Sequence, residues 1–168
     1  KGGVGKTTTS VNLSASLGVL EKKILLIDAD PQANATSSLG VNLYDENTTK
    51  TFYEVLENTT SIKDSILSTD SPNLDIIPSS IDLVGAEIEL VNVNDREKML
   101  SNQINLIKSD YDFIFIDCPP SLGLITINCL SASDSIIVPI QCEYFALEGL
   151  GKLMSTIRQI QSHHNNEL

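Results

Sequence analysis

The stretch Lys1-Gly2-Gly3-Val4-Gly5-Lys6-Thr7-Thr8 decides the fold. Its glycines allow backbone conformations that other residues rarely adopt, so consecutive N–H groups can converge on a phosphate. Gly5 leads directly into an expected helix, whose N-terminus supplies partial positive charge and free N–H donors. In such a loop Lys6 reaches the β- and γ-phosphates, and the Thr7 hydroxyl ligates Mg²⁺. The alternative, a glycine-rich turn that opens an ordinary helix, is less favoured because Gly2 and Gly3 are adjacent.

The general phosphate-loop pattern, G-x₄-G-K-[ST], requires a glycine immediately before Lys1. The sequence begins at that lysine, without a methionine. We therefore expect residues 1–168 to be an internal fragment of a longer protein.

Apolar, strand-sized runs alternate with segments of helical spacing, which indicates an α/β fold with a mostly parallel, twisted sheet flanked by helices. Residues 29–50 are rich in Asn, Ser, Thr and Gly and predict a long functional loop. We expect strands at 23–28, 74–78, 111–117 and 135–140, and helices at 6–20, 51–57, 61–67, 82–91, 95–108, 122–131 and 146–161.

Acidic residues end two of the expected strands. Ligands of parallel sheets bind at the carboxyl ends of the strands, where Asp28 and Asp117 fall. Asp117 is the candidate for the metal-positioning acid of a nucleotide site. Asp28 and Asp30, at the tip of the earlier strand, could hold or polarise a water beside a metal and phosphate. The alternative is that these acids only cap strands and form turns.

Composition excludes several classes of protein. The chain has 168 residues, of which 41% are hydrophobic and 20% charged, as in a single globular domain. No apolar run approaches the roughly 18 residues of a membrane span. The formal net charge of −11 argues against a broad nucleic-acid-binding surface on this segment. Three cysteines, Cys118, Cys129 and Cys142, are interpreted as reduced thiols that act as small buried fillers.

Three blocks, at compatible spacing, resemble the ParA/Soj/MinD group of deviant Walker-A ATPases. They are the phosphate loop at 1–8, Asp28-Ala-Asp-Pro-Gln-Ala-Asn34 and Asp117-Cys-Pro-Pro-Ser121. The segment Pro139-Ile-Gln-Cys-Glu-Tyr-Phe-Ala-Leu-Glu-Gly149 is similar to the Soj-like (ParA) partition branch. The resemblance implies one P-loop ATPase domain over residues 1–168, truncated at both ends. Its first strand would precede Lys1, and roughly a third of the fold would follow Leu168.

The resemblance also implies roles for the phosphate-loop residues. Lys1 corresponds to the signature lysine that reaches across a dimer to the partner's nucleotide, where a cation neutralises charge developing on the phosphoryl oxygens. Lys6 corresponds to the phosphate-binding lysine, and residues 1–8 together form the nucleotide-binding loop. Thr7 and Asp117 correspond to the Mg²⁺ site, with Asp117 in the Walker B position.

Further positions match the segments that respond to the nucleotide in this group. Asp30 corresponds to the switch I acid that orients the attacking water, and Pro119–Gly123 to the second switch. Glu143 corresponds to a residue that approaches the ribose across the dimer. Ala33 stands where many members of the group have glycine, a departure that bears on the flexibility of switch I.

The function implied by the resemblance is an Mg²⁺-dependent ATPase that works in chromosome or plasmid partitioning. ATP would join two subunits into a homodimer, and hydrolysis to ADP and phosphate would separate them. A ParB-like partner would stimulate turnover. The ATP dimer would bind DNA non-specifically, through regions mostly beyond Leu168. We expect a cytoplasmic, nucleoid-associated bacterial protein with no membrane anchor in this segment.

Three alternatives share parts of the pattern. A MinD-like cell-division ATPase has the same loop but carries an amphipathic anchoring helix at its C-terminus. A redox ATPase like the nitrogenase iron protein bridges an Fe–S cluster between subunits, but the cysteines here do not fit, since Cys118 abuts Asp117. A non-enzymatic scaffold would bind ATP without useful hydrolysis.

Overall fold

A four-stranded sheet forms the centre of the structure, a computed structural model that describes residues 2–42 and 50–168. The strand order is β2-β3-β1-β4. β1 pairs in parallel with β3 and with β4, while the short β2 is antiparallel to β3. The predicted α/β fold with a mostly parallel sheet is confirmed. The strands are β1 (Ile24–Asp28), β2 (Leu67–Ser68), β3 (Leu74–Ile77) and β4 (Phe113–Asp117).

β1 forms because its apolar run can be buried on both faces. Ile24 to Ile27 are wholly buried, and their side chains alternate between two hydrophobic clusters. Leu25 and Ile27 face the larger cluster, and Ile24 and Leu26 the smaller. The parallel register places Asp28 opposite Asp117, so both acids reach the same edge of the sheet.

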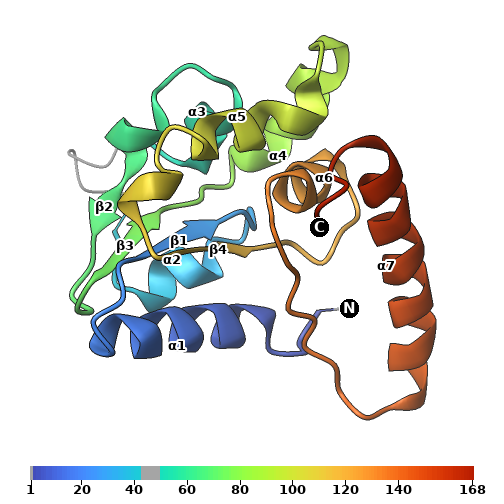
Figure 1. Cartoon of the computed structure of the whole chain (residues 1–168), viewed down its shortest axis with the longest axis horizontal. Coiled ribbons are helices and arrows are strands. Elements are labelled where there is room, and N and C mark those ends of the chain that lie inside the picture. The colour runs from blue at the N-terminus through green and yellow to red at the C-terminus, as the bar shows by residue number, and fades with distance from the viewer. Residues whose placement is uncertain (1, 43–49) are drawn as a thin grey trace.

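Helices cover both faces of this sheet. Figure 1 shows α1 and α2 beneath it, α3 to α6 above it, and the long α7 at one side. α1 begins where the glycine-rich loop ends, as the sequence predicts. The helices are α1 (Lys6–Val19), α2 (Asn34–Ser38), α3 (Phe52–Leu56), α4 (Leu83–Glu89), α5 (Met99–Ile104), α6 (Leu124–Ser131) and α7 (Tyr144–His163).

The expected strand at 135–140 is wrong: this segment has no regular secondary structure. An apolar run becomes a strand only where a neighbour supplies ladder hydrogen bonds, and Pro139 has no N–H to donate. Among the described strands β4 is the outermost on this side. Residues 135–140 line a groove along β4 together with β4 itself, and do not pair with it.

Other differences concern short segments. The helix expected at 61–67 is a 3₁₀ turn at Ile62–Ser65, and after Ile66 the chain continues into β2. The helix expected at 95–108 is divided, with α5 between 3₁₀ turns at Arg96–Lys98 and Lys108–Asp110. The loop expected at 29–50 contains α2, and its residues 43–49 lie outside the described part of the chain.

A close approach at Gly18 fixes the end of α1 against the loop before β3. A Cβ at Gly18 would lie in contact with the carbonyl oxygen of Pro72, and Asn73 Nδ2 donates to the Gly18 carbonyl at 3.0 Å. We expect Gly18→Ala to lower the free energy of unfolding by about 1–3 kcal/mol, because backbone atoms must move apart. Urea unfolding followed by circular dichroism measures this change.

The matched control is Gly151→Ala within α7, where a Cβ meets no atom within 4 Å. Alanine there should stabilise the helix by about 0.5–1 kcal/mol. Equal behaviour of the two variants would contradict a steric role for Gly18.

Candidate nucleotide-binding site

The glycine-rich loop turns sharply into α1. Gly3 and Gly5 have φ angles of +75° and +90°, which favour glycine. Gly5 is the N-cap of α1, no side chain of the described residues caps this end, and the first turn contains no acidic residue. The backbone N–H groups of the first turn therefore face a position that an anion can fill, which is the geometry of a phosphate site.

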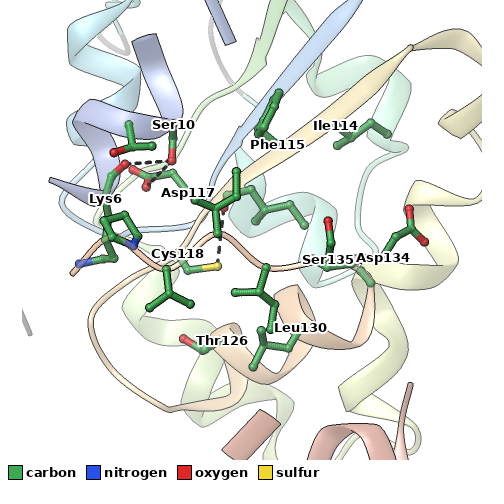
Figure 2. Close-up of a pocket in the computed structure, with 18 of the residues that line it drawn as sticks. Lys6, Ser10, Ile114, Phe115, Asp117, Cys118, Thr126, Leu130, Asp134 and Ser135 are labelled. Carbon is green, nitrogen blue, oxygen red and sulfur yellow. Dashed lines mark hydrogen bonds between the residues drawn. The ribbon is translucent and has the colours of Figure 1, made fainter. Parts of the chain in front are cut away.

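Asp117, at the end of β4, faces the first turns of α1 (Figure 2). Ser10 Oγ donates to Asp117 Oδ1 at 3.1 Å, while Oδ2 is buried and has no hydrogen-bond partner among the described residues. Burial raises the pKa of Asp117, an effect opposed by the hydroxyls of Thr7 and Ser10 and the charge of Lys6. A buried carboxylate oxygen without a partner, beside a threonine hydroxyl, fits the oxygen ligands that Mg²⁺ prefers.

Asp28 is also buried, but its oxygens are fully engaged. Oδ1 accepts from the N–H of Asp30 at 3.1 Å, and Oδ2 accepts from the N–H and Oγ1 of Thr36 at 2.8 and 2.7 Å. Thr36 Oγ1 in turn accepts from the N–H of Ser79 at 3.0 Å. Asp28 therefore ties the end of β1 to α2 and to the segment after β3.

Asp30 lies in a tight turn between these anchors. Its Oδ1 accepts from the N–H of Gln32 at 3.0 Å, and its carbonyl accepts from the N–H of Ala33 at 2.9 Å. Ala33 has a left-handed backbone, with φ +51°, and is the N-cap of α2. Glycine adopts this conformation without the steric cost that a Cβ carries. Asp30 lies close enough to Asp117 for its charge to raise the pKa of Asp117.

The structure thus brings together Lys6, Thr7, Asp30 and Asp117, four of the residues that the sequence singles out. Lys1 lies outside the described residues. The remaining loop residues Gly2, Gly3, Val4 and Gly5 form the turn before α1, and Thr8 is exposed in its first turn.

Sequence reasoning did not assign Ser10 or Thr36 to the site. Ser10 lies one helical turn after Lys6 and accordingly on the same face of α1, so its position could have been inferred. Thr36 had no such signal, because its role depends on a short helix that the composition did not predict.

The segment before α7 returns to the phosphate loop. Gln141 Nε2 donates to the Gly3 carbonyl at 3.2 Å, and Glu143 is the N-cap of α7. A groove of about 810 Å³ lies between this segment and β4, and Lys6, Ser10 and Asp117 are among the residues that line it.

The cysteines fit a structural role only in part. Cys129 is buried, and the neighbouring Cys118 thiol and burial raise its pKa, so it is an inert packing residue as expected. Cys142 is exposed, so the interpretation as a buried filler is wrong there. Among the described residues, no group of three or more His, Cys, Asp or Glu side chains could hold a metal ion by itself.

Comparisons of the sequence with a family model and with curated proteins point to the same family. A family model described as an AAA domain matches residues 1–168. The sporulation initiation inhibitor protein Soj of Bacillus subtilis is 53% identical over 168 residues, covering 100% of this chain and 66% of Soj. The chromosome partitioning protein ParA of Myxococcus xanthus is 49% identical over 168 residues, covering 100% of this chain and 59% of ParA. The chain therefore spans about three fifths to two thirds of these relatives.

Solved structures agree in fold. Cobyrinic acid a,c-diamide synthase from Mycobacterium smegmatis, with a bound ATP analogue and magnesium, superimposes with a TM-score of 0.94 at 38% identity, covering 100% of this chain and 68% of that chain. A plasmid partition protein from Borrelia burgdorferi bound to AMPPNP gives a TM-score of 0.85 at 33% identity, covering 96% and 66%.

The burial of Asp28 predicts a pH-dependent stability. Burial raises its pKa to about 6, against the hydrogen bonds from Thr36 and Asp30. The Asp28 carboxyl therefore binds its proton more tightly in the native state than in the unfolded chain. The contribution of this group to the free energy of unfolding is greatest below about pH 4. It should fall by up to about 3 kcal/mol as the pH rises through 6.

Asp28→Asn removes the titrating group. As the pH rises from 4 to 7, the unfolding free energy of the wild type should therefore fall relative to that of the variant. Urea unfolding at pH 4, 5, 6 and 7 measures it, with Asp82→Asn, at an exposed aspartate, as control. A difference that does not change with pH would contradict the assignment.

Proposed function

The chain belongs to the AAA-domain family of P-loop ATPases that includes Soj and ParA, and from this premise we propose that it is the nucleotide-binding part of an Mg²⁺-dependent ATPase. The whole protein would hydrolyse ATP to ADP and phosphate. The observation that carries the proposal is the buried Oδ2 of Asp117, which has no hydrogen-bond partner among the described residues, in a carboxylate that lies beside Thr7 and Ser10 of α1.

Each residue has a distinct part in this proposal. The N–H groups of the glycine loop and the Lys6 ammonium bind the β- and γ-phosphates. Thr7 and Asp117 hold Mg²⁺, which when bound neutralises charge on the phosphate oxygens. Asp30, held by Asp28 and Gln32 at the same edge of the sheet, orients the attacking water.

We place the reaction in chromosome or plasmid partitioning because Soj and ParA are 53% and 49% identical to this chain. The M. smegmatis synthase is less similar, at 38%. In this proposal ATP joins two copies of the whole protein, Lys1 reaches the partner's nucleotide, and Glu143 approaches its ribose. A ParB-like protein stimulates turnover, and the dimer binds DNA non-specifically at the bacterial nucleoid, in the cytoplasm. Among the described residues, no helix is long and apolar enough to cross a membrane.

We further propose that residues 1–168 belong to one P-loop domain. In P-loop proteins a strand precedes the phosphate loop. The groove beside the free edge of β4 is the place where such a strand would pair in the whole protein.

Lys6→Ala should weaken binding of a fluorescent ATP analogue with Mg²⁺ by about 100-fold or more, because the site loses its positive side chain while three acids remain. Fluorescence titration measures the dissociation constant. Lys22→Ala, at an exposed lysine just after α1, is the matched control and should bind like the wild type. Unchanged binding by Lys6→Ala would rule out the proposed phosphate site.

Asp30→Ala, made in the complete protein, should stop phosphate release while ATP binding and ATP-dependent dimerisation persist. Asp30 acts on the water and not on the phosphates, so only the chemical step depends on it. Phosphate release and sedimentation with ATP measure the two properties, with the exposed Asp70→Ala as control. If Asp30→Ala still turned over ATP, another residue would have to orient the water.

A further inference from the structure

The outward face of α4 carries a row of exposed aliphatic side chains. The backbone turns helically before and after α4, through bonds such as Val84 N–H to the Ile81 carbonyl and a 3₁₀ turn at Leu90–Asn92. Ile81, Val84, Ile88 and Val91 recur at spacings of three, four and three residues, which places them on one face. They are 65%, 53%, 75% and 52% exposed. We call these four residues the α4 stripe.

The opposite face of α4 already anchors the helix. Leu83, Ala86 and Leu90 are buried in the larger hydrophobic cluster. The α4 stripe therefore adds nothing to the core. Single exposed apolar residues are common on proteins, but a contiguous row of four aliphatic side chains marks an interaction surface.

Acidic residues flank the α4 stripe, so a molecule that binds there should carry positive charge at its edges. Glu87 and Glu89 are exposed and lie on either side of the stripe at helical spacing. Glu89 Oε2 accepts a hydrogen bond from the Tyr53 hydroxyl at 2.8 Å, and the other carboxylate oxygen can still pair with a cation. The chain as a whole carries a net charge of −11. Two copies packed stripe to stripe would bring like charges together, and phosphate groups of DNA or anionic lipid would be repelled.

The stripe adjoins the segment that leads away from Asp117. The carboxylate of Glu87 fills the space that a Cβ on Gly123 would occupy. Gly123 is the N-cap of α6 and ends the segment that begins with Pro119. A molecule docked on α4 therefore lies beside the proposed second switch.

We propose that the α4 stripe docks an amphipathic helical segment of a partner protein, with aliphatic residues at matching spacing and Lys or Arg beside them. Apolar contact supplies the affinity, and the basic residues pair with Glu87 and Glu89. This interaction goes beyond the proposed ATPase reaction and does not depend on hydrolysis.

The test uses a synthetic helical peptide with leucines at 3-4-3 spacing and lysines on both flanks, labelled for fluorescence anisotropy. Its twin carries glutamates in place of the lysines. The whole chain should bind the basic peptide at least ten-fold more tightly than the acidic twin. Ile88→Asp and Val84→Asp should each weaken binding of the basic peptide at least ten-fold. Leu106→Asp, which changes a 59% exposed leucine outside the stripe, should leave it unchanged.

Equal binding of the two peptides, or no loss in Ile88→Asp and Val84→Asp variants that keep the wild-type circular dichroism, would overturn the proposal. A dimer in sedimentation that Ile88→Asp abolishes would also overturn it, because the occupant would then be a second copy. Titration with a fluorescent ATP analogue separates the two proposals. If the wild-type chain bound the basic peptide but no nucleotide, the proposed ATPase function would be contradicted and the proposed docking site would still be supported.

Discussion

Two buried carboxylates side by side at the end of the sheet are the constraint on which the rest of the site depends. The register of β1 with β4 sets Asp28 opposite Asp117, and both are almost completely buried. Buried charges of one sign are costly unless donors or cations compensate them. The structure solves this problem differently for each acid. Asp28 receives three hydrogen bonds from the chain, whereas Asp117 keeps one oxygen without a partner among the described residues.

The different hydrogen-bonding of the two acids explains the conformation of the loops around them. Because Asp28 uses Thr36 and the Asp30 N–H, it holds both sides of the turn that carries Asp30. The same turn places Ala33 in a left-handed conformation, which costs about 1 kcal/mol for a residue with a Cβ. The anchoring of Thr36 to Asp28 and of Ser79 to Thr36 offsets that strain. Asp117 is supported instead from α1, by the hydroxyls of Thr7 and Ser10 and the charge of Lys6, to which the metal proposed above would add.

Sequence reasoning succeeded where a local pattern determines the outcome. The glycine loop and α1 follow from backbone freedom and helix geometry, and β1 and β4 from apolar runs that end in acids. It failed where structure depends on distant partners. Residues 135–140 have the composition of a strand but no ladder. Thr36 enters the site through a five-residue helix that its contacts with Asp28 and Ser79 and the buried Ala35 hold in place. Pro139 is a local sign against a strand at 135–140, but the missing ladder partner and the contacts of Thr36 cannot be inferred from residues near them in sequence.

The charges of the site imply that metal and nucleotide bind together. Asp28, Asp30 and Asp117 converge where Lys6 and the N-terminus of α1 supply the positive charge. A triphosphate alone would add several negative charges beside Asp117, whose burial already disfavours its ionised form. A divalent cation held by Thr7 and Asp117, as proposed above, would reverse the sign of that interaction, because it would place positive charge beside the buried carboxylate. In the function proposed above, the buried carboxylate of Asp117 would therefore disfavour a free triphosphate and favour the nucleotide bound together with magnesium.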